Sequence, residues 1–273
     1  DANDLIVFNN NDQFNPEATQ IKVKSKLEKI GQAVIPGFYG GKENGEIVTV
    51  SRGGSDITGS IIAKGIDSQL YENWTDVSGF LIADPKIVKN SRPIKTITYK
   101  ELRELSYMGA PVLHEEAIFP VKQANIPINI KNTNFPEEPG TMIVDDSYPI
   151  SSSGTITGIA GKKGFTVISI EKTLMSLEKD FYRKLLTVLE TNNVSVEHMP
   201  SSIDSVSLVI SNTELNSKLE KIIEEICIYC NPDSIISYAD MALIAVVGRG
   251  MIRNKGISAK IFTALANNGV NIR

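Results

Sequence analysis

The residues best suited to bind an anion lie in the segment from Ser51 to Asp56, which reads Ser-Arg-Gly-Gly-Ser-Asp. Adjacent glycines let backbone N–H groups approach a ligand closely, and a helix that begins after them adds positive potential at its N-terminus. The planar guanidinium of Arg52 matches a carboxylate or a phosphate. Ser55 and Asp56 could cap the helix or contact a substrate amine. A capped turn without a ligand fits the same spacing, so both interpretations stay open here.

A second polar group follows the next apolar segment. Thr75 and Asp76 end a predicted strand, and Asp84 and Lys86 close the loop behind it. Because ligands of open α/β sheets bind at the carboxyl ends of the strands, these side chains could converge at one edge of a sheet. A hydroxyl, two carboxylates and an ammonium group suit a magnesium nucleotide. In the alternative interpretation both aspartates are turn residues and Lys86 is solvated.

Cysteine and histidine chemistry is poorly supported. Cys227 and Cys230 have the spacing of a metal or redox pair, but zinc needs four ligands and the chain adds only His114 and His198. We therefore interpret both cysteines as helix-packing residues and expect no resident metal site. His114 is interpreted as structural, and two histidines are too few for a persuasive serine–histidine–acid triad. The segment 171–179 is most simply a solvated loop, although it could form one side of a ligand site.

The composition excludes several classes of protein. With 273 residues, 41% of them hydrophobic and 22% charged, the chain is neither disordered nor fibrous. The 28 basic and 32 acidic residues are scattered and give a net charge of -4, so no nucleic-acid partner is expected. No apolar run approaches the roughly 20 residues that a membrane span needs, and the N-terminus is no signal peptide. We expect a soluble, reduced, cytoplasmic protein without a membrane partner.

The elements that must position the polar groups alternate strands, helices and glycine turns as far as Val144, which is typical of an α/β sheet with crossover helices. Thr98 and Glu101 form a predicted capping box for one helix, and Gly109 is placed to end it. Strands are predicted at 46–50, 70–75, 126–130 and 141–144, and further helices at 57–66 and 115–124. A serine-rich linker follows.

Beyond the linker the predicted order is β-α-β-β-α-β, the ferredoxin-like arrangement. Strands are predicted at 165–170, 194–198, 206–210 and 235–238, with one helix from Phe181 to the pair Asn192-Asn193 and another from Thr213 through Ile226. A strand at 242–247 and a helix at 257–266 repeat the opening of this unit about 75 residues later, which indicates a duplicated domain. Because the first residue is not methionine and the last segment resembles an interrupted strand, we expect a fragment.

Several motifs follow one another in a fixed order, namely 51–56, 74–77, 83–86 and 108–114, then the stretch from 127–130 to 139–141. In this order they resemble the aspartate kinase family, and the resemblance covers essentially the whole chain. It implies an α/β fold with part of an amino-acid-kinase, carbamate-kinase-like three-layer sandwich and ferredoxin-like βαββαβ ACT domains. The implied ranges are 1–145 for the kinase domain, 146–156 for a linker, 163–238 for a first, inserted ACT domain, and 157–162 with 239–273 for a second, incomplete one.

The resemblance also implies an activity, which is phosphorylation of the side-chain carboxylate of L-aspartate by ATP with Mg²⁺. This reaction is the first step towards lysine, threonine and methionine. Arg52 would receive the aspartate carboxylate, supported by Gly53, Gly54, Ser55 and Asp56. The residues that would border ATP are Thr75, Asp76, Leu81, Asp84, Lys86, Pro111 and Val112.

In lysine-sensitive members of the family the effector lies at the ACT interface of a dimer. The resemblance therefore implies a homodimer through the ACT domains and an amino-acid effector, with lysine favoured over threonine. The implied effector residues are Met175, Glu178, Phe181, Tyr182, Ser195, Val196, Glu197, Ser201 and Ser202. In the alternative interpretation Phe181 and Val196 belong to the core and the serines form turns.

The chain departs from the family in three respects. Pro111 stands where many relatives have lysine, and Lys86 stands where many have arginine, which keeps the charge without the planar fork. The Lys-Phe-Gly-Gly segment that opens the family does not precede Asp1, so we expect the chain as given to be inactive alone. The alternative function is a non-catalytic, amino-acid-binding ACT module. A fused homoserine dehydrogenase would need a Gly-x-Gly-x-x-Gly segment after Arg273, and this sequence contains none.

Overall fold

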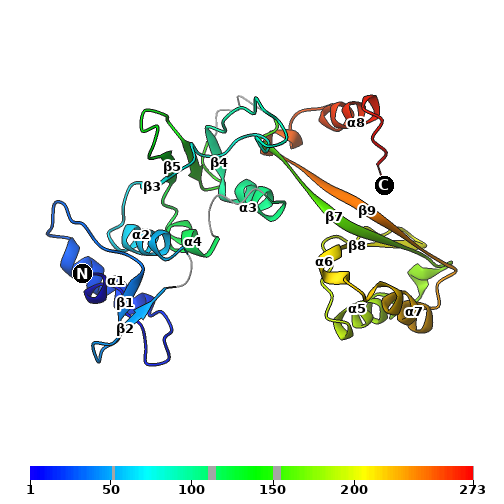
Figure 1. Ribbon diagram of the computed structural model, residues 1–273, viewed down its shortest axis with the longest axis horizontal. Coiled ribbons are helices and arrows are strands. Elements are labelled where there is room, and N and C mark those ends of the chain that lie inside the picture. The colour runs from blue at the N-terminus through cyan, green and yellow to red at the C-terminus, as the bar shows by residue number, and fades with distance from the viewer. Residues whose placement is uncertain (51–52, 110–114, 150–154, 273) are drawn as a thin grey trace. The chain divides into compact units, whose positions relative to one another are not determined.

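The computed structural model describes residues 1–50, 53–109, 115–149 and 155–272 (Figure 1). The chain folds into two compact units. The first consists of residues 1–160 and 245–273, and the second of residues 161–244. No helix within the described ranges is long and apolar enough to cross a membrane.

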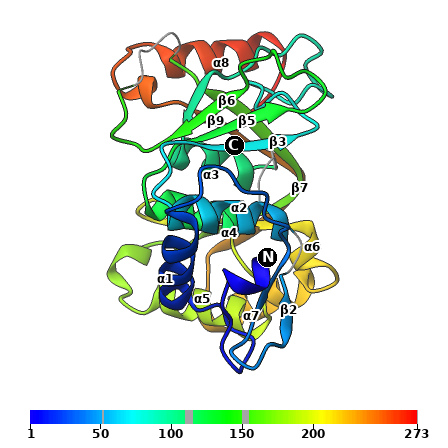
Figure 2. The ribbon, with the colours of Figure 1, turned by 90° about the vertical axis from the view of Figure 1, so that its left-hand side faces the viewer.

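The N-terminal part of the first unit contains the short helix η1 (Ala2–Asp4), helices α1 (Pro16–Leu27) and α2 (Gly54–Gly65), and an antiparallel hairpin of β1 (Tyr39–Gly41) and β2 (Ile47–Thr49). Helix α2 packs against both α1 and α4 (Glu115–Gln123), as Figure 2 shows. The helix predicted at 57–66 and the strand predicted at 46–50 are confirmed, although the strand lies in this hairpin. The small core consists of Leu5, Ile6, Phe8, Val23 and Ile61.

Gly65 lies where α2 packs on α1. A Cβ atom at this position would stand 2.3 Å from Cγ1 of Val23, which is fully buried. We expect Gly65→Ala to lower the free energy of unfolding by about 1–3 kcal/mol, because an added methyl group overpacks this contact. Gly31→Ala is the control, since nothing lies within 4 Å of its added Cβ. Urea unfolding of both variants tests this, and equal midpoints would contradict it.

The main sheet of the first unit has four strands in the order β3-β5-β6-β4. They are β3 (Tyr71–Thr75), β4 (Thr96–Thr98), β5 (Ile128–Asn132) and β6 (Thr141–Val144). β3 pairs with β5 and β4 with β6 in parallel, while β5 and β6 are antiparallel. The strand predicted at 126–130 begins two residues later, because Ile126 still donates its N–H to Val121 at the end of α4 and Asn125 has a φ of +55°.

The capping box at the start of α3 (Tyr99–Tyr107) is confirmed. The Thr98 hydroxyl accepts from the Glu101 N–H at 3.2 Å, and Glu101 Oε2 accepts from the Thr98 N–H at 3.0 Å. Gly109 follows the helix with a φ of +98°, as expected of a C-terminal stop. The second carboxylate oxygen of Glu101 accepts from the Thr157 hydroxyl at 2.7 Å and from the Arg249 N–H at 3.0 Å. This buried carboxylate therefore joins three segments of the first unit.

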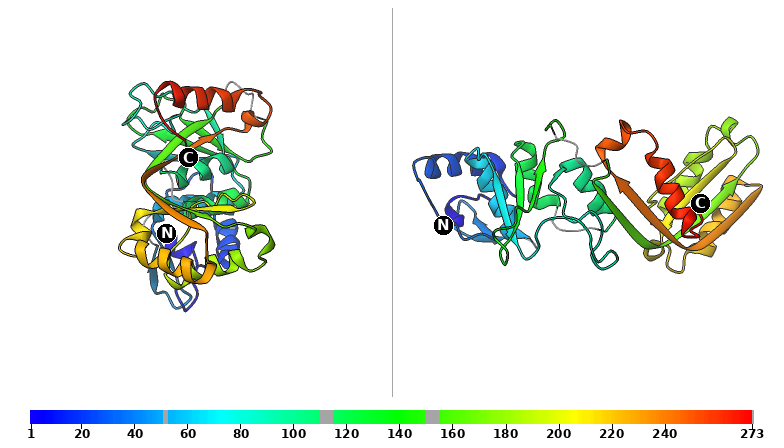
Figure 3. Two further views of the ribbon diagram at one scale, coloured as in Figure 1. Left: turned by 90° about the vertical axis from the view of Figure 1, so that its right-hand side faces the viewer. Right: turned by 90° about the horizontal axis from the view of Figure 1, so that it is seen from above.

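The second unit is built on a three-stranded sheet in the order β8-β7-β9. Its strands are β7 (Gly158–Glu171), β8 (Ser205–Ser211) and β9 (Ser234–Val247), and Figure 3 shows the long strands β7 and β9 side by side. The helical elements are η2 (Met175–Leu177), α5 (Phe181–Thr191), α6 (Asn212–Leu215) and α7 (Leu219–Cys230). The core includes Ile168, Ile170, Phe181, Leu185, Leu208, Ile222 and Ile226. The predictions of α5 and of strands within β7 and β8 are confirmed.

The single helix predicted from Thr213 is wrong. The chain forms α6 and α7 with a break at Asn216, whose φ is +42°. Asparagine tolerates positive φ better than most residues. The break places Lys218 so that its ammonium donates to the carbonyl oxygens of Asn192 and Asn193 at 3.0 and 3.3 Å, at the C-terminal end of α5.

The strand predicted at 194–198 is also wrong. In the described structure this segment forms no strand: an isolated bridge joins His198 to Val209 of β8, and the Glu197 N–H donates to the Val209 carbonyl at 2.9 Å. The Ser195 N–H donates to the Glu214 carboxylate at 3.4 Å and is therefore not paired with a neighbouring strand. The strands predicted at 235–238 and 242–247 form one continuous strand, β9, which passes through Asp240 at a φ of +56°.

The last part of the first unit contains η3 (Arg249–Ile252) and α8 (Ile257–Asn267), so the helix predicted at 257–266 is confirmed. The domain boundaries expected after 162 and 238 fall inside β7 and β9. These boundaries stay a prediction.

Candidate functional site

The N-terminus of α2 carries the segment that the sequence singles out. Gly53 is the N-cap residue with a φ of +84°, and no side chain among the described residues caps the helix. A Cβ atom on Gly54 would lie 2.9 Å from the Phe38 ring and 3.1 Å from Cβ of Val50, so only glycine fits without displacing them. Thr58 ties the first turn to this loop, since its hydroxyl donates to the Gly54 carbonyl at 2.7 Å and accepts from the Phe38 N–H at 3.1 Å.

Asp56 of the first turn is held by strand β3. Its Oδ1 accepts a hydrogen bond from Nδ2 of Asn73 at 3.0 Å, and its carbonyl accepts one from the Tyr71 hydroxyl at 3.2 Å. Ser55 and Asp56 therefore do not cap the helix, which removes the capped-turn interpretation for these two residues. Arg52 lies outside the described residues. The sequence pattern did not single out Asn73 or Tyr71. Side chains that alternate along a strand do not show which helix they will face.

The polar residues at the end of β3 form a second cluster. The Thr75 hydroxyl donates to Asp76 Oδ1 at 3.2 Å, and the Thr75 carbonyl accepts from the N–H and the hydroxyl of Thr133 at 2.8 and 2.9 Å. Asp84 Oδ1 accepts from the Lys86 N–H at 2.8 Å, so Asp84 forms a turn as the alternative interpretation held.

The two parts of this predicted nucleotide edge are not joined directly. Within the ranges that the structure describes, no hydrogen bond or ion pair connects Thr75 or Asp76 with Asp84 or Lys86. The side chains of Asp76, Asp84 and Lys86 are exposed, and Leu81 forms an isolated bridge with Pro93. Pro111, Val112 and His114 lie outside the described residues.

Trp74 is a surface residue beside this cluster that the sequence reasoning did not assign. The Lys131 ammonium of β5 lies 4.8 Å from the centre of its ring, and its indole N–H donates to Glu72 at 3.2 Å. Trp74 and Lys131 are direct partners in the parallel pair of β3 and β5. The contact depends on strand pairing and therefore has no local signal.

Among the predicted effector residues, Met175 and Phe181 are fully buried in the core of the second unit, with 1% and 0% exposed. Tyr182 and Val196 are partly buried and pack against the same core. The structure therefore places Phe181 where the alternative interpretation expected it. Met175 and Phe181 could shape a site but cannot contact a ligand without local rearrangement.

The charged effector candidates already have partners within the chain. Glu178 forms ion pairs with Lys172 at 2.6 Å and Lys184 at 3.2 Å, and hydrogen bonds from these two ammonium groups lower the pKa of Glu178. Glu197 lies 4.0 Å from the Lys162 ammonium. An effector ammonium would therefore have to compete with lysine side chains for either carboxylate.

The serine candidates differ in their surroundings. Ser195 donates its N–H to Glu214, whereas Ser201 bridges to Val206 and the Ser202 N–H donates to the Ser205 carbonyl at 2.7 Å. Ser201 and Ser202 thus belong to the turn that leads into β8.

The two cysteines have different environments. Cys230 is buried, and burial raises the pKa of its thiol, as expected of a packing residue. Cys227 is exposed, so its interpretation as a packing residue is wrong. It lies three residues earlier on α7 and faces solvent. In the described part of the chain, no group of three or more histidine, cysteine, aspartate or glutamate side chains is arranged to hold a metal ion.

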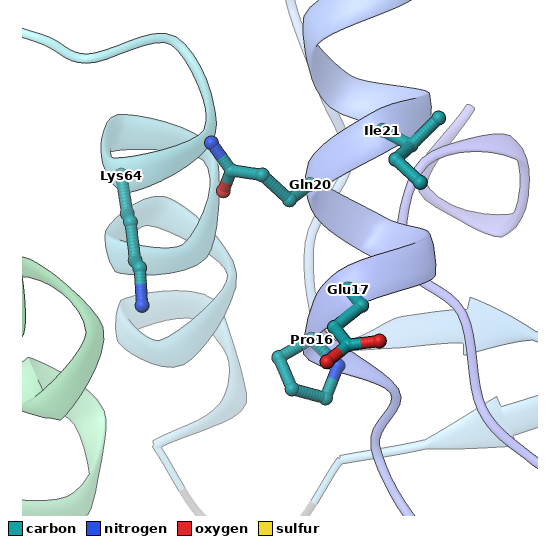
Figure 4. A pocket seen from close by; sticks show the side chains of 5 residues that line it. All are labelled: Pro16, Glu17, Gln20, Ile21 and Lys64. Atoms are coloured by element: carbon teal, nitrogen blue, oxygen red, sulfur yellow. The ribbon is translucent and has the colours of Figure 1, made fainter.

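A surface groove of about 390 Å³ lies between α1 and α2. Figure 4 shows the side chains that line it, which are Pro16, Glu17, Gln20, Ile21 and Lys64. None of them belongs to the predicted sites. Lys64 donates to the Gln123 side chain at 2.9 Å, and the Gln20 side chain donates to the Gly65 carbonyl at 3.4 Å.

Comparison with known proteins places these features in a family context. Residues 7–132 match the amino acid kinase family, and residues 244–273 match an ACT domain. The chain is 40% identical to Aspartokinase 3 of Bacillus subtilis over 263 residues, which cover 96% of the chain and 57% of that protein. It is 30% identical to Aspartokinase of Bacillus sp. over 98% of the chain and 64% of that protein.

Solved structures of aspartate kinases also match the chain. The crystal structure of Clostridium acetobutylicum aspartate kinase matches the whole chain with 60% identity and a TM-score of 0.90, and the match covers 62% of that chain. The structure of E. coli aspartokinase III with lysine and aspartate matches at 23% identity and a TM-score of 0.72, which shows the same fold. The chain therefore spans less than two thirds of the length of these relatives.

Proposed function

The chain belongs to the aspartokinase family, and from this premise we propose that it forms part of an enzyme that phosphorylates L-aspartate with ATP. The observation that carries the proposal is the similarity to Aspartokinase 3 of Bacillus subtilis, which extends over almost the whole chain. The product would be 4-phospho-L-aspartate, in the first step towards lysine, threonine and methionine.

In the proposed reaction a carboxylate oxygen of the aspartate side chain attacks the γ-phosphorus of ATP. The bond between that phosphorus and the β,γ-bridging oxygen breaks, and ADP leaves. A carboxylate is already ionised at neutral pH, so no general base is needed and catalysis depends on positioning and charge neutralisation. The N-terminus of α2 would provide the positioning: Arg52 would receive a carboxylate of the substrate, and Ser55 and Asp56 would support that pocket.

The nucleotide is assigned to the other polar cluster. Thr75, Asp76, Leu81, Asp84 and Lys86, with Pro111 and Val112, would border MgATP. Mg²⁺ in kinases is held largely by substrate phosphates and one or two carboxylates, so the exposed carboxylates of Asp76 and Asp84 fit this use. The Lys86 ammonium would neutralise phosphate charge.

Regulation is proposed to act through the ACT sequence. We expect a homodimer through the ACT domains and an amino-acid effector, with lysine favoured over threonine. E. coli aspartokinase III has been solved with lysine, which supports this choice by fold similarity. Glu178 and Glu197 would supply carboxylates for the effector ammonium, in exchange for their present lysine partners. Inhibition requires that the effector bind one conformational state more tightly than the other.

The protein expressed from the complete coding sequence tests both proposals. We expect ADP release that depends on both ATP and L-aspartate, measured by a coupled assay, with D-aspartate and L-glutamate as control substrates. Absence of aspartate-dependent ADP release would overturn the activity. Calorimetric titration with L-lysine and with L-threonine tests the regulation, and binding of neither would overturn it.

A further inference from the structure

The turn that follows β3 is held by residues at the end of β5. Asn132 is the last residue of β5 and the direct partner of Thr75 in the parallel pair of β3 and β5, and only 4% of its surface is exposed. Its Nδ2 donates to the Ser78 hydroxyl oxygen at 2.9 Å, and its Oδ1 accepts from the Asn134 N–H at 2.9 Å. One buried amide therefore joins the turn after β3 to the turn after β5.

The turn after β3 is also held at both of its ends. The Thr75 carbonyl accepts from the N–H and the hydroxyl of Thr133 at 2.8 and 2.9 Å. Gly79 has a φ of +86°, and a Cβ atom there would stand 2.3 Å from Oγ1 of Thr141, so only glycine fits. The same Oγ1 accepts from the Phe80 N–H at 2.8 Å. The backbone that enters and leaves the turn is therefore tied to β6 and to the segment after β5.

Asp76 is the first residue after β3 and lies between these fixed points. Its side chain is exposed, and its Oδ1 accepts from the Thr75 hydroxyl at 3.2 Å. Because β3 and β5 are parallel, their carboxyl ends meet at one edge of the sheet, which is where open α/β sheets bind ligands. A carboxylate on a turn that is fixed in this way presents its oxygens in a defined direction, as the binding of a metal-bound phosphate requires.

We infer that Asn132 is a positioning residue for the nucleotide, which holds the turn after β3 so that Asp76 faces the phosphates of ATP. The inference rests on the proposed function, in which Asp76 borders MgATP. A purely structural role, in which Asn132 only joins two turns, predicts a different result. It would lower stability without weakening the nucleotide more than the amino-acid substrate.

The experiment measures the Kd for MgADP by calorimetric titration, together with the KM values for ATP and L-aspartate, in the protein expressed from the complete coding sequence. Asn132→Leu keeps the approximate volume and removes the donor to Ser78. We expect the Kd for MgADP and the KM for ATP to rise about tenfold, because a small displacement of a group that binds charge weakens the interaction strongly. The KM for L-aspartate should change less than about twofold.

Ser78→Ala removes the same hydrogen bond from its other side. Ser78 is only partly buried, so this variant is the milder change. We expect its Kd for MgADP to rise about threefold, as the loss of one hydrogen bond allows. In the double variant the two effects should not multiply, because both substitutions remove one and the same bond. An unchanged Kd for MgADP in Ser78→Ala, or an equal rise of the two KM values in Asn132→Leu, would overturn the inference.

Asn192→Leu is the matched control. Asn192 is also buried, at 7% exposed, but it donates to Glu225 and Val188 in the second unit. We expect this variant to lose stability without a change in the Kd for MgADP. A rise equal to that of Asn132→Leu would overturn the inference, since the loss of any buried amide would then have the same effect. A wild-type protein without MgADP binding and without aspartate-dependent turnover would instead overturn the proposed function.

Discussion

Replacing Arg52 with alanine is expected to lower kcat/KM for L-aspartate by about 10²-fold or more. A bidentate pair between a guanidinium and the substrate carboxylate contains two charge-assisted hydrogen bonds, each worth about 1.5–3 kcal/mol. Their loss corresponds to at least about two factors of ten, since each factor costs about 1.4 kcal/mol. Arg52→Lys should lose about tenfold, because lysine keeps the charge but not the planar fork.

The surroundings of the segment explain why this position should matter. Gly53 and Gly54 lead into the start of α2, and within the part of the chain that the structure describes no side chain caps its first turn. Arg52 directly precedes these glycines in the sequence. A substrate carboxylate bound there would meet both the guanidinium and the positive end of the helix.

Steady-state kinetics with varied L-aspartate at saturating ATP measure the effect. Arg253→Ala serves as the control, because Arg253 is exposed and belongs to the ACT sequence. Normal kcat and KM in Arg52→Ala would refute the assignment of the substrate carboxylate to this residue.

Features that depend on short spacing were predictable from the sequence. The capping box of Thr98 and Glu101 and the glycine that follows α3 are recognisable within a dozen residues. The helix after the diglycine turn could be read from its apolar periodicity. In these places local preference and the final fold agree.

Features that depend on distant partners were not predictable. The helix break at Asn216 is accompanied by contacts of Lys218 with the end of α5, and the Ser195 N–H donates to the Glu214 carboxylate. Neither partner follows from the local pattern. The sequence predicts two separate strands on either side of Asp240, but β9 is continuous through this residue.

The same limit applies to the candidate site. The bond between Asn73 and Asp56 joins a strand to the preceding helix, and its geometry depends on how α2 packs on the sheet. Glu101 was assigned only its capping role, whereas its other oxygen bonds Thr157 and Arg249, which are 56 and 148 residues away. Sequence patterns can indicate that Asp56 and Glu101 are important, but they do not identify the distant residues that bond to them.

Replacing Glu101 with alanine is expected to lower the free energy of unfolding by about 3 kcal/mol or more. Glu101 is 5% exposed, and its carboxylate accepts hydrogen bonds from Thr98, Thr157 and the Arg249 N–H. Removing it leaves the buried Thr98 N–H and the partly buried donors of Thr157 and Arg249 without their acceptor, and an unsatisfied buried donor costs about 1–3 kcal/mol. Such a loss is a large part of the roughly 5–15 kcal/mol that stabilises a typical domain.

The effect should depend on pH. Burial alone would raise the pKa of Glu101, but the hydrogen bonds from Thr157, Thr98 and Arg249 outweigh it and hold the pKa below its ordinary value of 4.5. The ionised carboxylate therefore stabilises the fold fully above about pH 4.5, and this contribution is lost as the pH falls through the lowered pKa. Glu101→Gln should be less stable than wild type at pH 7, and the difference should shrink in acid.

Urea unfolding between pH 3 and pH 7 tests this with Glu104→Ala as the matched control, since Glu104 is an exposed glutamate on the same helix. Because Glu101 lies in the amino acid kinase match and Arg249 in the ACT match, loss of the carboxylate removes a direct bond between the two sequences. We therefore expect Glu101→Ala, but not Glu104→Ala, to expose residues 249–252 to faster amide exchange. Equal stability and equal exchange in the two variants would contradict this role of Glu101.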